Sequence, residues 1–324
     1  MKSFESFLAP LFDEYLIHRK TLGYHTKPTL SHLKTFDRYI KERKIKQGPL
    51  APSLFLELRA DLKIEARSVN GVISSVRVFF QYLVRKGIYD ENPLQDIALL
   101  TQNDIVPFIF LPEQIDQLLE AICRKIRKSP RRYLTDLSKY MAITLIARCG
   151  LRISEPLRLM RSHYRKDEKT LYIKKTKFKK NRLIPVPMTV ATELENYLAV
   201  RDELLKNDYI PYLLVGVHQK RMKPHMITYV FYPALEDIGL AGKRQVIGNK
   251  NFSAPTVHSL RHSFAVNTLK QIKQRGGSAQ NALPVLAAYM GHSEYKHTIK
   301  YLKMMDADHR KNLFHFVTSR KENL

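Results

Sequence analysis

The chain has 324 residues, with 55 Lys and Arg against 30 Asp and Glu, so its formal net charge is +25. With 44% hydrophobic residues it can bury a sizeable core, which favours a folded protein with a positive surface over a disordered basic tail. Its two cysteines exclude a disulfide framework, and we expect no signal peptide and no membrane-spanning segment. A field of this sign favours a polyanionic partner, nucleic acid first.

The first part of the chain, residues 1–105, is predicted to be a bundle of helices. Apolar residues recur at three- and four-residue spacing in the stretches 4–15, 29–44 and 69–86. This part holds 16 Lys and Arg and 12 Asp and Glu, so its net charge is only +4. A domain boundary is expected within the polar, proline-marked stretch 92–108.

The second part, residues 106–324, is predicted to be a mostly helical α+β domain that carries the remaining net charge of +21. Residues 133–147 indicate a buried helix that ends at Gly150, and Ser154 is expected to cap another helix. The predicted fold is therefore mostly α with a small β-sheet. The stretch 240–255 is expected to be an extended loop, and the sequence leaves open what it does, with DNA and a neighbouring subunit as the two candidate partners.

Two short strand-like runs, 171–174 and 182–186, predict a β-hairpin in this second domain. Six basic side chains lie at or beside its tip: Lys174, Lys175, Lys177, Lys179, Lys180 and Arg182. A basic run is usually a solvated face. On the tip of a hairpin in a strongly positive domain, we expect it to contact phosphates.

Several kinds of catalytic site lack their sequence signature. The chain has no GxxxxGK[ST] loop, no GxGxxG and no HExxH, so ATP hydrolysis, a Rossmann cofactor and this type of zinc site are not expected. Acidic residues do not cluster near the basic stretches, which disfavours Mg²⁺-dependent cleavage. The sequence therefore predicts neither a metal nor a cofactor.

Three short segments instead concentrate cationic and imidazole side chains. In Cys149-Gly-Leu-Arg-Ile-Ser-Glu155, Arg152 can either hold a phosphate or pair with Glu155 at the surface. In His258-Ser-Leu-Arg-His262, three side chains share one helical face and could form an anion site, although a structural His or a metal-binding pair remains an alternative. Met290-Gly-His292 is followed nine residues later by Tyr301.

Together these segments resemble the tyrosine recombinases of the integrase family. The first is similar to their G-L-R-x-x-E box, the second to H-x-L-R-H, and the third to L-G-H with a tyrosine nine residues on. Lys177 precedes Pro185 by eight positions, as the family's β-turn lysine precedes its proline. The motif resemblance covers about residues 112–324. Residues 1–105 resemble the family's core-binding, SAM-like helical domain by pattern only.

The resemblance implies a role for each matched residue. Tyr301 would attack the scissile phosphate and form a 3′-phosphotyrosyl link, while Arg152 and Arg261 stabilise the pentacovalent transition state. His258 would assist proton transfer from the phenol, and Lys177 would protonate the 5′-hydroxyl leaving group. His292 would donate a hydrogen bond to the phosphate. Glu155 and His262 would hold these residues in position without binding the phosphate themselves.

The resemblance also implies a biological setting. It predicts a site-specific recombinase that integrates or excises DNA of a mobile element through a Holliday junction, as a homotetramer on double-stranded DNA with specific sites. An accessory protein or sister recombinase could assist, and the enzyme would work in the cytoplasm, on the nucleoid. The alternatives are a type IB topoisomerase-like enzyme with the same chemistry and a DNA-binding factor without catalysis.

Overall fold

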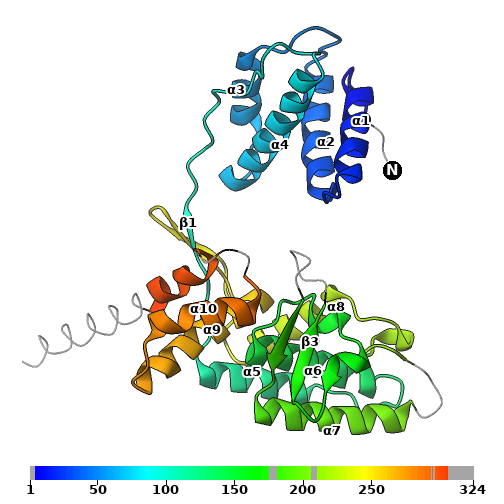
Figure 1. Ribbon diagram of the computed structural model, residues 1–324, viewed down its shortest axis with the longest axis vertical. Coiled ribbons are helices and arrows are strands. Elements are labelled where there is room, and N and C mark those ends of the chain that lie inside the picture. The colour runs from blue at the N-terminus through cyan, green and yellow to red at the C-terminus, as the bar shows by residue number, and fades with distance from the viewer. Residues whose placement is uncertain (1–3, 175–180, 206–209, 293, 295, 306–324) are drawn as a thin grey trace, which may run out of the picture. The chain divides into compact units, whose positions relative to one another are not determined.

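The computed structural model describes residues 4–174, 181–205, 210–292, 294 and 296–305. The chain divides into two compact units, residues 1–104 and 105–324. The division lies one residue before the boundary of 105 and 106 expected from the sequence. Figure 1 shows the elements of the two units with their labels.

The first unit consists of helices in its described part. They are α1 (Ala9–Thr21), α2 (Lys27–Glu42), α3 (Pro52–Asp61) and α4 (Ala66–Arg85). The three helices predicted from periodicity are α1, α2 and α4, whereas α3 was not expected. Proline occupies the first turn of α1, α2 and α3, where its missing N–H has no intrahelical partner to lose.

Aromatic rings form the core of this first unit. Phe79 on α4 lies with its ring centroid 4.7 Å from that of Phe12 and 5.4 Å from that of Tyr15, both on α1. Phe80 meets Phe55 of α3 at 5.3 Å in an edge-to-face contact. Such ring pairs add attraction beyond the area they bury, so the aromatic residues specify how the helices pack.

The second unit joins a larger helical layer to two small sheets (Figure 1). In chain order its elements are β1 (Asp104–Val106), α5 (Pro112–Arg124), α6 (Tyr133–Cys149), the 3₁₀ turns η1 (Pro156–Arg158) and η2 (Arg161–His163), β2 (Tyr164–Arg165), β3 (Thr170–Ile173), β4 (Arg182–Pro185), α7 (Met188–Leu204), η3 (Val217–Gln219), α8 (Pro224–Asp237), β5 (Gln245–Ile247), β6 (Lys250–Phe252), α9 (Val257–Gln274) and α10 (Ala279–Met290). Residues 296–305 are also helical.

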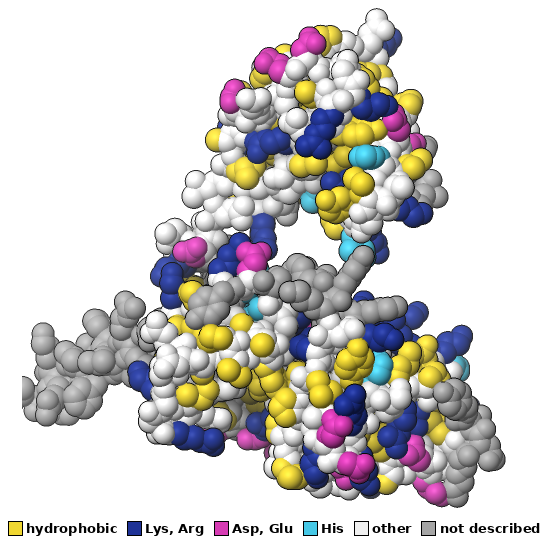
Figure 2. Space-filling view, viewed as in Figure 1, with side chains coloured by type: hydrophobic (Ala, Val, Ile, Leu, Met, Phe, Trp, Pro, Cys, Tyr) yellow, Lys and Arg dark blue, Asp and Glu magenta, His cyan; other side chains and the backbone are white. Residues whose placement is uncertain are grey.

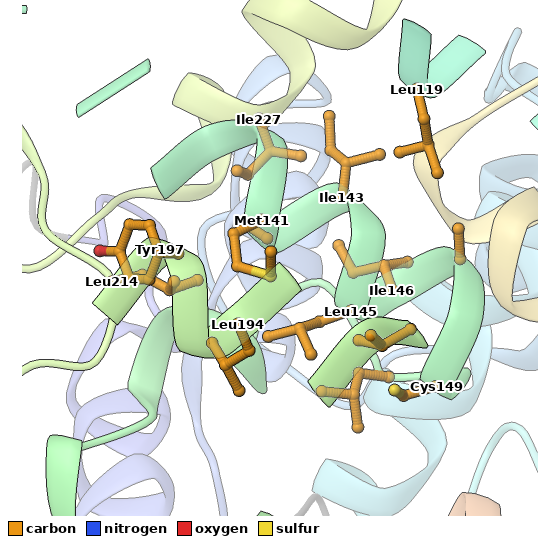
Figure 3. Close-up of a cluster of buried hydrophobic side chains, with 14 of the residues drawn as sticks. Leu119, Met141, Ile143, Leu145, Ile146, Cys149, Leu194, Tyr197, Leu214 and Ile227 are labelled. Atoms are coloured by element: carbon orange, nitrogen blue, oxygen red, sulfur yellow. The ribbon is translucent and has the colours of Figure 1, made fainter. Parts of the chain in front are cut away.

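Helix α6 is the centre of the second unit. Its residues Met141, Ile143, Leu145 and Ile146 are all buried, and Figure 3 shows them among side chains of the neighbouring elements. A helix that is apolar on all sides is one that neighbours surround. Helix α6 ends at Gly150, which adopts the left-handed conformation with φ 59°. This fixed end starts the segment that carries Arg152.

The strands form two three-stranded sheets. One has the order β2-β3-β4 and is antiparallel throughout, with Leu171 opposite Ile184. Strands β3 and β4 are the two sides of the hairpin predicted from the sequence. The other sheet has the order β1-β6-β5, and its strands β5 and β6 pair antiparallel.

Two local expectations were wrong. The helix expected after Ser154 is a turn followed by the single 3₁₀ turn η1, because Leu159 already turns to extended backbone, with ψ 134°. The extended loop expected over 240–255 contains the β5–β6 hairpin instead. In the part of the chain that the structure describes, no helix combines the length and the apolar character that crossing a membrane requires.

Candidate active site

Three segments of the second unit meet at one place. They are the turn after α6, with Arg152 and Glu155, the first turns of α9, with Arg261 and His262, and the stretch after α10 that ends at Tyr301. Hydrogen bonds join all three segments, as the following contacts show. The segments are far apart in sequence, so the packing of α6, α9 and α10 assembles the site.

Arg261 lies at the centre of this site with only 2% of its surface exposed. Its two terminal nitrogens donate to the backbone oxygens of Gly150, at 2.5 Å, and Met290, at 2.6 Å. The ends of α6 and α10 thus hold the guanidinium in one orientation. Burial, followed by the charge of Arg152, lowers the pKa of Arg261 to about 9, which leaves it charged at neutral pH.

Arg152 is held by two acceptors. Its Nη1 donates to Glu155 Oε1 at 3.0 Å, and its Nη2 donates to the backbone oxygen of Gly291 at 2.9 Å. Its side chain remains 20% exposed, so a ligand can still reach it. The sequence left open whether this arginine binds a phosphate or pairs with Glu155. The structure shows that Arg152 pairs with Glu155 and that its side chain is still partly exposed to solvent.

Arg182 takes up a different position from the DNA contact that the sequence predicts. Its Nη1 and Nη2 donate to the two oxygens of Glu155 at 3.0 and 2.9 Å, and its Nε donates to the Tyr289 backbone oxygen at 2.7 Å. Its side chain is only 10% exposed. The side chain is therefore engaged inside the protein, where it ties β4 to the turn after α6.

Glu155 is the acid that these arginines share. It is 6% exposed, and burial alone would raise its pKa. Hydrogen bonds and charge from Arg182, together with the Arg152 backbone N–H and the charge of Arg261, outweigh burial and hold the pKa of Glu155 below its ordinary value. It is therefore a carboxylate that fixes two guanidinium groups in place.

Tyr301 is almost completely buried, with 1% of its surface exposed. Burial raises the pKa of its phenol to about 12, although the charges of Arg261 and Arg152 act in the opposite direction. Its hydroxyl lies 3.0 Å from Nδ1 of His262. At neutral pH the phenol is therefore protonated, and it can donate its hydrogen to this imidazole.

His258 and His262 lie one helical turn apart, and their rings meet nearly perpendicular at 4.6 Å. The pKa of His262 is lowered to about 3, first by burial and then by the neighbouring His258 and Lys300. His258 lies at the surface, yet desolvation of its ring and the charge of Arg261 lower its pKa to about 4. Both imidazoles are therefore neutral at pH 7, with one ring nitrogen that can accept a hydrogen bond. The one that touches the phenol is His262, which the sequence placed in a supporting role.

His292 and Lys300 complete the surroundings of the phenol. The His292 ring stacks on that of Tyr301 with 6.1 Å between centroids, and its Nδ1 lies 2.8 Å from Thr298 Oγ1. Lys300 Nζ lies 5.6 Å from the centroid of the Tyr301 ring. Lys300 was not singled out from the sequence as a site residue, although the basic run that precedes Tyr301 was a signal for it.

The remaining predicted residues belong to the β3–β4 hairpin. Lys174 is described and exposed. Lys175, Lys177, Lys179 and Lys180 lie outside the described residues. In the ranges that the structure describes, no group of three or more His, Cys, Asp or Glu is arranged to hold a metal ion.

The site can therefore bind an anion beside the phenol of Tyr301. Arg152, Arg182, Arg261 and Lys300 bring four positive charges around the single carboxylate of Glu155 and the phenol of Tyr301. The guanidiniums are fixed by carbonyl and carboxylate oxygens before any ligand arrives, which is how charge that develops during a reaction is stabilised most effectively. This is an arrangement suited to nucleophilic attack on a phosphate.

Known proteins that resemble this chain point in the same direction. Residues 109–308 match the model of the phage integrase family. "Putative integrase/recombinase y4rE" of Sinorhizobium fredii is 30% identical over 305 residues, 93% of each chain. A "Tyrosine recombinase" of Pseudothermotoga lettingae is 27% identical over 92% of this chain and 93% of its own length, and the XerD tyrosine recombinase of Rickettsia bellii is 24% identical over 99% and 100%.

The fold has close counterparts among solved structures. A lambda integrase dimer bound to a core site aligns with a TM-score of 0.64 and 16% identity, over 91% of this chain and 76% of that chain. The Tn1549 transposon integrase in complex with a circular intermediate DNA aligns with the same TM-score and identity, over 92% and 95%. At such low identity, these likenesses show the fold alone.

Proposed function

Since this chain belongs to the phage integrase family, we propose that Tyr301 is the nucleophile with which it cuts and rejoins DNA. The chain is a tyrosine recombinase, an enzyme that transfers DNA strands in site-specific recombination. The observation that carries the assignment is the hydrogen-bonded frame in which Arg261 and Arg152 are held beside the phenol. The proposed roles of the individual residues follow from this frame.

Arg261 and Arg152 bind the non-bridging oxygens of the scissile phosphate. Each guanidinium has five N–H donors, and the hydrogen bonds found among the described residues use two of them in each. The two cations also repel each other, since the charge of Arg152 lowers the pKa of Arg261. A bound phosphate relieves this repulsion, and it is held more tightly as its oxygens gain charge in the transition state.

Proton transfer from the phenol begins at His262. With a pKa near 12, Tyr301 attacks only when a base removes its proton or when the guanidiniums lower that pKa. His262 is already within hydrogen-bond reach of the phenol, and His258 adjoins it. We assign His262 as the first proton acceptor once the negative charge of a bound phosphate raises its lowered pKa, and the exposed His258 as the imidazole nearer to solvent, with His292 supporting the phosphate.

The covalent step conserves the energy of the broken bond. The phenolate oxygen forms a bond to phosphorus while the bond from phosphorus to the 5′ oxygen breaks, and Lys177 supplies the proton that this leaving oxygen takes up. Attack by a 5′ hydroxyl on the phosphotyrosyl link later reverses both bonds and returns the proton. The proposed reaction therefore uses neither ATP nor a metal, and the protein's own cations stabilise its charge.

DNA contacts are proposed to extend beyond the catalytic residues. Lys174, Lys175, Lys179 and Lys180 on the β3–β4 hairpin would contact phosphates, and the helical unit of residues 1–104 would bind the same duplex. The excess of 55 Lys and Arg over 30 Asp and Glu supports this, and Figure 2 shows Lys and Arg side chains on the visible face of each unit. We further propose a homotetramer on two specific sites, helped by an accessory or sister recombinase where needed, and acting on DNA in the cytoplasm.

The decisive test is a covalent adduct. Wild-type protein and Tyr301→Phe would be incubated in EDTA with nicked duplexes that carry candidate sites from the DNA flanking the gene. A denaturing gel should show an EDTA-resistant protein–DNA adduct for the wild type and none for Tyr301→Phe. Both proteins should bind the duplex equally, because the substitution removes only the reacting oxygen.

Tyr229→Phe is the matched control. Tyr229 on α8 is 74% exposed, so removal of its hydroxyl should leave adduct formation at the wild-type level. An adduct with Tyr301→Phe would refute the assignment of the nucleophile. Loss of the wild-type adduct when EDTA is added would refute the metal-free mechanism.

A further inference from the structure

The β5–β6 hairpin is a ribbon that stands out from its unit. All residues from 241 to 250 are exposed, including the whole of strand β5. The strands pair in the register Gln245 with Phe252, Val246 with Asn251, and Ile247 with Lys250. At the tip, Gly248 has φ 56°, and no atom would lie within 4 Å of a methyl group placed there. Figure 1 shows the ribbon, in yellow, projecting away from α9 and α10.

The ribbon exposes apolar side chains on both faces. Val246 is 59% and Ile247 63% exposed, and neighbouring residues of a strand point to opposite faces. A two-stranded hairpin is marginally stable by itself. This one is anchored at its base, where β6 adjoins β1 and the Ser253 backbone N–H donates to the Val106 oxygen at 2.9 Å. The base is therefore fixed while the apolar tip remains available to a partner.

The charge of the ribbon indicates the chemistry of that partner. Lys243, Arg244 and Lys250 lie on or beside it, and the stretch 238–256 contains no acidic residue. Asp104 on β1 is the one acid among the nine residues of this sheet. A protein partner would need acidic side chains opposite these basic residues, and a second copy of this chain is poor in them, whereas every DNA duplex offers phosphates for the lysines as well as apolar thymine methyl groups.

The ribbon also leads directly to the proposed phosphate site. Four residues separate Phe252, the end of β6, from Val257, the start of the helix that carries Arg261, so the chain makes five Cα–Cα steps between them. Five such steps span at most about 18 Å. A duplex with its phosphate at Arg261 therefore passes within reach of the ribbon.

The dimensions select the groove. Each strand has three residues and is about 10 Å long, with its partner roughly 5 Å away. The major groove is about 12 Å wide and 8.5 Å deep and admits a two-stranded ribbon, whereas the minor groove, about 6 Å wide, admits one only when the duplex is bent or widened.

We propose that the β5–β6 ribbon enters the major groove of the target duplex and reads its sequence. Val246 and Ile247 contact thymine methyl groups on base edges, and Lys243 and Lys250 bind the phosphates that line the groove. The ribbon would thus be a specificity element separate from the residues that cut the strand. The proposal rests on the proposed function in one respect, namely that duplex DNA is the substrate.

The test compares base readout with and without the apolar tip. Full-length wild type and the double variant Val246→Ser with Ile247→Ser would each select binding sites from a randomised duplex library at fixed salt. The wild-type motif should contain a block of positions that the variant does not enrich. At those positions, replacing thymine by deoxyuridine should weaken wild-type binding about fourfold for each lost methyl contact and leave the variant unaffected.

Two further variants serve as controls. Val217→Ser removes another half-exposed valine of the same unit and should select the wild-type motif. Lys243→Gln with Lys250→Gln should lower the slope of log affinity against log salt by about two and keep the motif. Thermal melts should coincide for all variants, because each changed side chain is exposed.

The outcomes separate the two proposals. If the wild type binds no duplex, the proposed function fails and the ribbon proposal with it. If the wild type selects a motif and the tip variant selects the same one with the same response to deoxyuridine, the ribbon proposal alone is refuted. A tip variant that changes only the association of free protein into oligomers, with an unaltered motif, refutes it in favour of contact between copies of this chain.

Discussion

The two units bury polar groups for different purposes. In the first unit, buried Asp37 accepts hydrogen bonds from the backbone N–H groups of Glu5 and Ser6, and buried Asn70 bonds the backbone of Leu100 in both directions. In the second unit, the buried polar groups include charges that pair with one another, such as Glu155 with Arg261 and Asp136 with Lys139.

The first unit is therefore built as a scaffold, whereas the second unit contains the proposed reaction site. In the first unit, buried polar side chains form hydrogen bonds with backbone groups outside the helices, and packed aromatic rings provide the stability. The second accepts the cost of burying charge, which a hydrophobic replacement would often avoid. A phosphate-binding site needs fixed cations, so we expect substitutions in the first unit to change stability most and those in the site to change reaction rate most.

The largest expected effect is that of Arg261→Lys. Lysine keeps the charge but cannot donate to Gly150 and Met290 in the geometry of the guanidinium fork. Adduct formation on the nicked duplex should slow by about 10²- to 10³-fold. Arg124→Lys, at a side chain 75% exposed on α5, should react at the wild-type rate. An unchanged rate for Arg261→Lys would show that charge alone is enough.

Phe79→Ala should produce the largest loss of stability in the first unit. Its ring is fully buried and contacts three others, so the substitution should lower the free energy of unfolding by about 3–5 kcal/mol. Urea denaturation of the full chain measures this loss. Val78→Ala, at a neighbouring side chain 48% exposed, should cost far less. Equal losses for the two variants would contradict the ring-packed core.

Asp136 should make the stability of the second unit depend on pH. Burial would raise its pKa, but hydrogen bonds from Arg127 and Lys139 lower it to about 2, from an ordinary 3.8. A lowered pKa stabilises the fold above pH 4, and this stabilisation, about 2 kcal/mol, is lost as the pH falls toward 2.

Asp136→Asn tests this dependence. Denaturation at pH values from 6 to 2.5 should show that the wild type is more stable than the variant. The difference between their free energies of unfolding should decrease by about 2 kcal/mol across the acid range. Asp116→Asn, at a side chain that is 65% exposed, should differ little from the wild type in free energy of unfolding at every pH. A gap for Asp136→Asn that is independent of pH would rule out the ion cluster as its source.

The smallest expected effect compares two glycines with positive φ. Gly87 in the first unit has φ 70° and open space around it, whereas a methyl group at Gly291, φ 64°, would lie 3.0 Å from Arg182 Nη1. Alanine at either position should cost about 1–2 kcal/mol through backbone strain. Only Gly291→Ala should also slow adduct formation, because Arg182 must shift and Glu155 with it. Equal rates of adduct formation for Gly291→Ala and Gly87→Ala would show that Arg182 does not position the site.

Much of the molecule follows from local patterns. Apolar periodicity predicts α1, α2 and α4. The sequence also predicts that the buried helix, α6, ends at Gly150. The motif boxes named Arg152, Arg261, His292 and Tyr301, which the fold brings together. These features depend on a few neighbouring residues, so a linear pattern is enough to find them.

Other features lie beyond such patterns. Arg182 was grouped with the hairpin lysines because it is basic and close to them in sequence. Its actual partner, Glu155, lies 27 residues away and becomes a neighbour only when β4 packs beside the turn after α6. The 240–255 stretch has few strand signals, and its pairing with β1 depends on residues more than 100 positions earlier.

The sequence by itself determined the two-part organisation, the excess of positive charge, the order of the motif boxes and the family. Only the tertiary structure decided that His262 rather than His258 meets the phenol of Tyr301 and that this phenol is buried. The two histidines are almost equivalent along the chain. Which of them meets the phenol depends on how residues 296–305 pack against α9, and that packing is set by contacts between segments that no local pattern records.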